Sequence, residues 1–89
     1  MNQGKLRELR KQIDELDAKI IRALGERFSV VHEVRKQKKA AGLPARDDKR
    51  WQEVLDSRLA LAKEAELPLE FTEQLMNLIH ERSLEIENS

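Results

Sequence analysis

Basic residues recur at spacings that could hold a small anion. Arg27 and Lys38 are 11 residues apart, which on a helix returns to within about 20° of the same direction, three turns further along. They could present a guanidinium fork and an ammonium to carboxylates from one face. Arg10 precedes Arg27 by 17 residues, or roughly 25 Å along the axis and about 100° around it. It cannot join them on one small ligand, but Arg10 of an antiparallel second chain could.

Further polar residues with chemical potential lie near the other helix ends. Asp47 and Arg50 are three residues apart, so both belong to the first turn of a helix that begins there. Ser83 and Glu87 are four apart and share a helical face. Taken singly, each is ordinarily a solvated side chain on a chain this charged. Their combination is what could form a site.

The composition excludes several kinds of chemistry. The 89 residues hold 17 basic and 17 acidic side chains and no cysteine, so no disulfide, thiolate metal site or thiol nucleophile is expected. Residues 1–50 carry 14 basic against 8 acidic side chains, and residues 51–89 carry 3 against 9. This asymmetry indicates complementary packing between the halves or a cationic site for an anion. His32 has no partners at metal-ligand spacing.

Neither a nucleic acid nor a membrane is expected as a partner. The basic run over residues 35–39 resembles a nucleic-acid patch, but the chain is neutral and has only 3% aromatic residues. No apolar run reaches membrane length, and the polar start lacks a signal-peptide core. We therefore expect a soluble, cytoplasmic protein.

A single long helix, from Lys5 to Ala41, is predicted to position the first group of cations. Its apolar residues recur three or four apart: Leu6, Leu9, Ile13, Leu16, Ile20, Leu24, Phe28, Val31 and Val34. Gly42 and Pro44 supply the stop, and residues 1–4 are expected to be disordered. Such a helix runs roughly 55 Å, whereas a compact chain of this length has a radius of gyration of about 12 Å. A second chain should therefore cover its apolar stripe.

Two shorter helices complete an all-α chain, which we take as a single domain over residues 1–89. Asp47 or Asp48 should cap a helix that ends near Ala65, and Pro68 should start another over Leu69 to Glu87. The predicted inner residues of the former are Trp51, Val54, Leu55, Leu59, Leu61 and Ala62. Those of the latter are Phe71, Leu75, Leu78, Ile79 and Ile86.

The polar pattern as a whole resembles the all-helical chorismate mutase family. The matching residues cover essentially the whole chain: Leu9-Arg10-x-x-Ile13-x-x-Leu16-Asp17, Glu26-Arg27, Lys38, Arg46-Asp47-x-x-Arg50 and Ser83. The resemblance implies an intertwined six-helix homodimer in which each site takes one arginine from the partner. It also implies the pericyclic rearrangement of chorismate to prephenate, towards phenylalanine and tyrosine, with no metal or organic cofactor.

The resemblance assigns roles to particular residues. The implied substrate-binding residues are Arg10, Arg27, Lys38, Asp47, Arg50, Ser83 and Glu87, and Arg27, Lys38 and Glu87 are the implied catalytic members. Arg27 and the Arg10 of the other chain would clamp carboxylates. Lys38 would donate to a carboxylate and to the ether oxygen, and Arg50 would add positive field. Asp47 would accept from the ring hydroxyl, while Ser83 would contact the ring carboxylate side.

Two positions depart from the best-known bacterial pattern. Trp51 stands where that pattern has a glutamate that helps to hold the ring hydroxyl, and an indole N–H can only donate. Trp51 could instead anchor the core between the first and second helices. Glu87 stands where many bacterial members have a glutamine that donates to the ether oxygen. Because a carboxylate must be protonated to donate, we expect turnover to fall as pH rises and Glu87 ionises; a frayed, solvated Glu87 is the alternative.

Three other functions stay open on the same scaffold. Isochorismate–pyruvate lyase shares much of the cationic set, although Asp47 and Arg50 favour the mutase. Aminodeoxychorismate mutase is kept open by Trp51. A catalytically silent dimerisation or regulatory module is the non-enzyme alternative, but such a module has no need of cations at Arg10, Arg27, Lys38 and Arg50 together.

Overall fold

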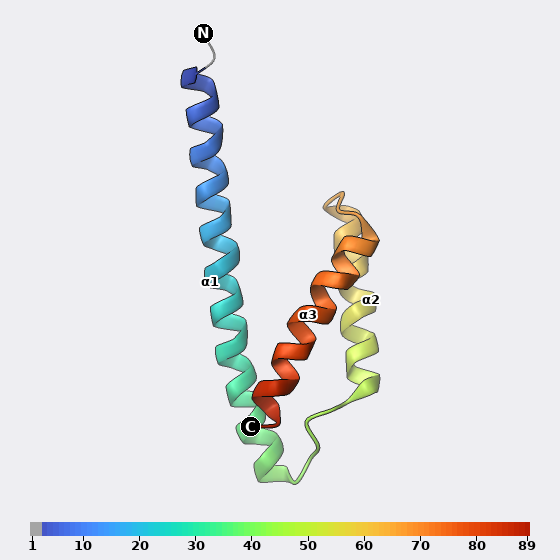
Figure 1. The fold of residues 1–89 in the computed structure, drawn as a ribbon. Coiled ribbons are helices and arrows are strands. Elements are labelled where there is room, and N and C mark those ends of the chain that lie inside the picture. Colours follow the sequence, from blue (N-terminus) through green and yellow to red (C-terminus); the bar gives the residue numbers. More distant parts are fainter. Residues whose placement is uncertain (1–2) are drawn as a thin grey trace. The chain divides into compact units, whose positions relative to one another are not determined.

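The computed structural model describes residues 3–89, which form three α-helices and no strand (Figure 1). The helices are α1 (Gln3–Ala41), α2 (Asp48–Glu64) and α3 (Leu69–Glu87). The predicted all-α chain with one long and two shorter helices is confirmed. Helix α1 begins at Gln3, two residues before the predicted start at Lys5. Met1 and Asn2 lie outside the described residues.

Gly42 ends α1 as its position in the sequence predicts. Its φ of 68° is left-handed, which glycine adopts without a Cβ penalty. The N–H of Leu43 donates to the Lys38 carbonyl at 2.8 Å, and the N–H of Gly42 donates to the Lys39 carbonyl at 3.2 Å. These paired bonds form a Schellman motif, which satisfies the last carbonyls of the helix. Glu66 takes the same conformation after α2, with a φ of 60°.

Two compact units divide the chain, one ending at Val30 and the other spanning Val31–Ser89. In the second unit, α2 and α3 pack side by side (Figure 1). Val54, Leu55 and Met76 form the buried centre of this packing. Partly buried apolar residues surround it: Trp51, Leu59 and Ile79. The pairing of α2 with α3 thus gives the second unit a core of its own.

The inner face of α3 differs from the predicted one. Phe71, Leu75 and Leu78 are 40–65% exposed, so three of the five predicted inner residues do not face the core. The buried residues of α3 are Thr72, Met76, Ser83 and Ile86. Leu61 on α2 is likewise exposed rather than buried. Helix α3 is apolar on more than one side, and periodicity alone does not say which side meets α2.

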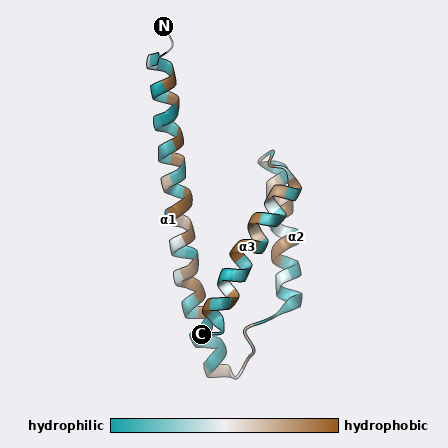
Figure 2. Cartoon of the chain, viewed as in Figure 1, coloured by the Kyte–Doolittle hydropathy of each residue, from teal (hydrophilic) through white to brown (hydrophobic). Residues whose placement is uncertain are grey.

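In the first unit, the apolar stripe of α1 is uncovered. Leu6, Leu9, Ile13, Leu16 and Ile20 are 43–57% exposed, and Figure 2 shows brown, apolar bands alternating with teal, hydrophilic ones along α1. A stripe of this length is unusual on a surface that meets only water. Among residues 3–89, no helix is long and apolar enough to cross a membrane.

Candidate functional site

An ion pair joins the end of α1 to the end of α3. The ammonium nitrogen of Lys38 lies 2.6 Å from Glu87 Oε1, and their side chains are only 22% and 11% exposed. The same ammonium donates to the Ala45 carbonyl at 2.6 Å. Lys38 therefore connects three segments: the last turns of α1, the loop before α2 and the last turn of α3. Two of the predicted catalytic residues, Lys38 and Glu87, are in contact.

Glu87 is poorly satisfied where it lies. Its Oε1 is buried and accepts no hydrogen bond of good geometry within the described residues, although Lys38 is close. Burial without full hydrogen bonding is costly for a carboxylate. Glu87 is thus not the frayed, solvated side chain that the sequence left open.

A second contact holds the same end of α3. Arg35 donates to a backbone oxygen of Ser89, the last residue of the sequence, through Nε at 2.9 Å and through a terminal guanidinium nitrogen at 2.5 Å. Lys39 donates to the same oxygen at 2.7 Å. The sequence interpretation treated this basic run as an apparent nucleic-acid patch and missed the contact. The signal available in the sequence was a pair of basic residues, Arg35 and Lys39, one turn apart near a helix end.

The first turn of α2 holds Asp47 and Arg50 together, as predicted. Asp47 is the N-cap, and its Oδ1 accepts from the Arg50 backbone N–H at 3.0 Å. The Arg50 guanidinium is exposed and lies 3.8 Å from Glu53, a separation that contributes little. Arg46 donates to Asp48 at 2.7 Å, and this hydrogen bond, with the carboxylate charge, raises the pKa of Arg46. This cap uses Oδ1 only and leaves Oδ2 of Asp47 for other partners.

Trp51 and His80 stack between α2 and α3. Their ring centroids are 3.8 Å apart and their planes differ by 6°. Trp51 also packs against the Val54, Leu55 and Met76 core. The anchor role suggested for Trp51 therefore falls between α2 and α3, and its expected place between the first and second helices was wrong. A ligand role for its indole stays a prediction.

Ser83 is buried, at 5% exposure. Its hydroxyl donates to the carbonyl of Ile79 one turn earlier, at 2.9 Å. A hydroxyl carries a single proton, so Ser83 must rotate to donate to a substrate carboxylate. It shares α3 with Glu87.

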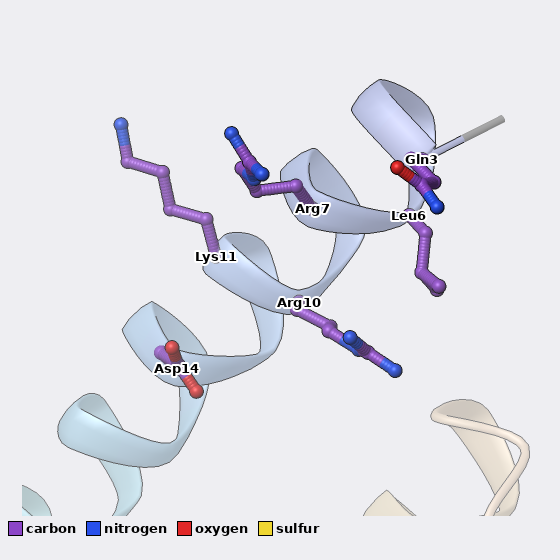
Figure 3. Close-up of a pocket in the computed structure, with 6 residues that line it drawn as sticks. All are labelled: Gln3, Leu6, Arg7, Arg10, Lys11 and Asp14. Atoms are coloured by element: carbon purple, nitrogen blue, oxygen red, sulfur yellow. The ribbon is translucent and has the colours of Figure 1, made fainter. Parts of the chain in front are cut away.

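Arg10 and Arg27 belong to the first unit, on α1. Arg27 is half-buried. Arg10 extends on the same side as Leu6, while Arg7 and Lys11 extend away from it (Figure 3). A hollow on this part of the helix is lined by Gln3, Leu6, Arg7, Arg10, Lys11 and Asp14. Arg10 thus lies beside the apolar stripe, where a covering chain would meet it.

The described residues offer cations and a buried carboxylate, which suit an anionic ligand. Among residues 3–89, no three His, Cys, Asp or Glu side chains converge as metal ligands. A lysine ammonium and arginine forks bind carboxylates without proton transfer. Within the second unit, Lys38 can therefore orient an anion and stabilise charge that develops on it.

Comparison with known proteins identifies the family. The model of chorismate mutase type II matches residues 9–88. The chain belongs to this family. A chorismate mutase of Methanocaldococcus jannaschii is 40% identical over 60 residues, which are 67% of this chain and 61% of that protein. A bifunctional chorismate mutase/prephenate dehydratase of Aquifex aeolicus is 39% identical over 59 residues, 66% of this chain and 16% of that protein. The chain thus spans less than two thirds of the length of either relative.

Membership of the family confirms the resemblance drawn from the polar pattern. The matched range contains every predicted site residue from Arg10 to Glu87. It also contains Arg35 and Lys39, the cations that the sequence interpretation passed over. The family does not by itself give the role of any of these residues.

Proposed function

We propose that the protein is a chorismate mutase, which rearranges chorismate to prephenate. The observation that carries this proposal is the half-buried Lys38–Glu87 pair in a chain of the chorismate mutase type II family. The reaction is intramolecular: the ether bond to the enolpyruvyl group breaks as a carbon–carbon bond forms. It needs no nucleophile. A site that accelerates it must hold the reactive conformer and stabilise the partial negative charge on the ether oxygen.

Lys38 has the donors for this task. An ammonium carries three N–H groups, of which one goes to Ala45 and one faces Glu87. The third can donate to a substrate carboxylate or to the ether oxygen. Because the side chain is only 22% exposed, its charge is weakly screened and acts strongly on a nearby atom. Its two protein partners fix its direction before substrate arrives.

Glu87 has two roles that can be separated. As an anion it orients Lys38; as an acid it donates to the ether oxygen, where an ionised carboxylate would repel developing charge. Asp47 uses Oδ1 for the helix cap and would accept the ring hydroxyl on Oδ2. Arg50 would add positive field from the same turn, and Ser83 would contact the ring carboxylate side.

Trp51 is better placed as an anchor than as a ligand. Its ring face is occupied by His80, so only its edge could reach a substrate. Asp47 would then be the residue that binds the ring hydroxyl of chorismate, and Asp47 alone would set the preference for the substituent at the carbon that carries this hydroxyl.

Arg27 and a partner chain's Arg10 would clamp the two carboxylates in a homodimer. Three observations support the dimer: the uncovered stripe of α1, the exposed Phe71 side of α3, and the place of Arg10 beside Leu6 (Figure 3). We propose one domain per chain, in the cytoplasm, with chorismate as its ligand and no cofactor.

The test is loss of the ultraviolet absorbance of chorismate in the presence of the purified protein. The expected result is turnover that disappears in Arg27→Ala, with prephenate as the product. Isochorismate, with salicylate and pyruvate as products to detect, tests the lyase. A well-folded dimer that turns over neither substrate would contradict an enzymatic role.

A complementation experiment tests the shared site. Arg10→Ala and Arg27→Ala homodimers should each be inactive. When the two are unfolded together and refolded, half of the dimers should be mixed, and each mixed dimer contains one site with both arginines. About a quarter of wild-type activity should return. If mixing restores nothing while mixed dimers are present, Arg10 and Arg27 do not serve one site from two chains.

A further inference from the structure

Trp51 packs the first turn of α2 on α3. Residues 46–50 are exposed, whereas Trp51 and His80 are both partly buried. Their rings stack with centroids 3.8 Å apart and planes that differ by 6°, and Trp51 also packs against the core of the second unit. Trp51 is thus the first side chain of α2 that is withdrawn from solvent.

The stack extends the contact between α2 and α3 beyond their shared core. The two helices diverge towards the start of α2 (Figure 1). The buried centre of their packing, formed by Val54, Leu55 and Met76, lies about one helical turn from the stack, towards the loop that joins the helices. Beyond this centre two rings, one from each helix, reach across the wider gap. The stack therefore holds α2 against α3 close to the cap of α2.

Trp51 is joined to Asp47 through the backbone. The N–H of Trp51 donates to the Asp47 carbonyl at 2.9 Å, and the N–H of Arg50 donates to Asp47 Oδ1 at 3.0 Å. These bonds close the first helical turn around its cap. A displacement of the Trp51 ring would therefore move the Asp47 carboxylate and the Arg50 side chain with it.

His80 is joined in the same way to Ser83. The two residues are three apart on α3 and share a helical face, and the Ser83 hydroxyl donates to the Ile79 carbonyl at 2.9 Å. The stack thus connects the turn that carries Asp47 with the turn that carries Ser83. Helix ends open more readily than helix interiors, so the exposed first turn of α2 is the part that such a contact would hold.

We propose that Trp51 and His80 are positioning residues that fix the first turn of α2, and with it the Asp47 carboxylate, relative to Ser83 on α3. The catalytic part of this inference rests on the proposed mutase function. The two rings touch no reacting atom; they act through the helix cap. His80→Ala is the informative change, because it removes the stack from α3 and leaves every residue of α2 in place.

The first measurement does not depend on turnover. Amide hydrogen exchange at Arg50 and Trp51 reports opening of the first turn of α2, and in His80→Ala it should be about fivefold faster, as loss of an aromatic pair implies. Exchange at Leu59, two turns further along α2, should change less. His32→Ala is the matched control, since the other histidine of the chain is exposed on α1; it should leave all three rates unchanged. Unaltered exchange at Arg50 and Trp51, or an equal rise at Leu59, would overturn the proposal.

Tryptophan emission tests whether the rings stack in solution. The chain has one tryptophan and no tyrosine, so the emission comes from Trp51. In His80→Ala the exposed indole face should shift the emission to longer wavelength, whereas His80→Phe keeps a ring in place and should not shift it. Unshifted emission in His80→Ala would contradict the stack and overturn the proposal.

Steady-state kinetics separates positioning from simple stabilisation. With chorismate as substrate, kcat/KM of His80→Ala should fall about tenfold, since small misplacements of a binding group cost that much or more. The loss should fall mainly on KM, because the ring hydroxyl does not react and its contact with Asp47 is a binding contact. His80→Phe should recover most of kcat/KM. A lower kcat at unchanged KM would indicate only a smaller folded fraction and would overturn the proposal.

A double-mutant cycle with Asp47→Ser gives the sharpest test. Serine also caps helices well, but its single oxygen is then used by the cap. If the stack acts through Asp47, His80→Ala in the Asp47→Ser background should change kcat/KM less than twofold. An undiminished tenfold loss there would overturn the proposal. If the wild type does not turn over chorismate, the proposed function fails, and hydrogen exchange at Arg50 and Trp51 alone decides whether the stack holds the first turn of α2.

Discussion

Replacing Lys38 should lower the free energy of unfolding more than replacing Glu87, its ion-pair partner. Lys38→Met removes the cation and leaves a carboxylate that is 11% exposed without a charge partner. Glu87→Gln removes the anion, but Lys38 keeps its bond to Ala45 at 2.6 Å and twice the exposure of Glu87. The two substitutions are similar in volume to the residues that they replace. They differ chiefly in which charge they leave unpaired.

The magnitudes follow from burial. Removing one partner of a fully buried pair costs about 3–5 kcal/mol, and the partial exposure here reduces this to about 2–3 kcal/mol for Lys38→Met. For Glu87→Gln we expect about 1 kcal/mol, since Lys38 loses its ion-pair partner but keeps its hydrogen bond to Ala45. In the double variant nothing is stranded, so its cost should be about 1–2 kcal/mol below the sum. These are sizeable fractions of a stability of about 5–15 kcal/mol.

Urea unfolding at neutral pH and fixed protein concentration measures these differences through the midpoint at constant slope. The matched control is the Lys36–Glu33 pair, whose atoms are 3.2 Å apart but whose side chains are both 66% exposed. Lys36→Met and Glu33→Gln should each cost less than about 0.5 kcal/mol. Equal costs for Lys38→Met and Glu87→Gln, with an additive double variant, would refute the view that this is a buried, coupled pair.

Three further outcomes are expected. Gly42→Ala should lower the free energy of unfolding by about 1 kcal/mol and Glu66→Gly should raise it slightly, because both positions have left-handed φ values near 60–70°. Thermal unfolding measures both changes, and shifts of the same sign for the two variants would contradict this explanation. If Glu87 donates to the ether oxygen as an acid, Glu87→Gln supplies an N–H donor in its place and should retain turnover, whereas Glu87→Ala should lose most of it; equal kcat values for the two variants with chorismate would exclude this role. Trp51→Ala should destabilise the fold by about 2 kcal/mol and His80→Ala by about 1 kcal/mol. Both variants remove the ring stack, but only Trp51→Ala also removes part of the core. Denaturant unfolding shows whether Trp51→Ala is the more destabilising of the two.

Local chemistry made the helix boundaries predictable. Gly42 stops α1 and Asp47 caps α2 through bonds within a few residues, so a short stretch of sequence contains all the necessary information. The start of α3 at Leu69, after Pro68, follows for the same reason. The stripe of α1 was also evident, because a helical repeat needs no knowledge of what covers it.

Contacts between distant segments were not predictable in the same way. The inner side of α3 was wrongly predicted because Phe71, Leu75 and Leu78 are as apolar as the residues that meet α2. Lys38 and Glu87 were each expected in the site from the family resemblance, yet only the path of the chain through α2 brings them together. The contacts of Arg35 and Lys39 with Ser89 were missed because cations on a highly charged helix are ordinarily solvated, and the sequence does not show which of them meets an acceptor from another helix.

The uncovered stripe of α1 links stability to assembly. Its five residues are about half exposed, so covering the remainder should contribute about 1 kcal/mol each, given about 1.5–3 kcal/mol for complete burial of such a side chain. On the proposed dimer this amounts to about 5 kcal/mol per chain, which is as large as the whole stability of many small domains. Folding and association would then be one equilibrium rather than two successive ones. Arg10, which lies beside Leu6 on this stripe (Figure 3), would reach its ligand only in the state in which the chain is also stable.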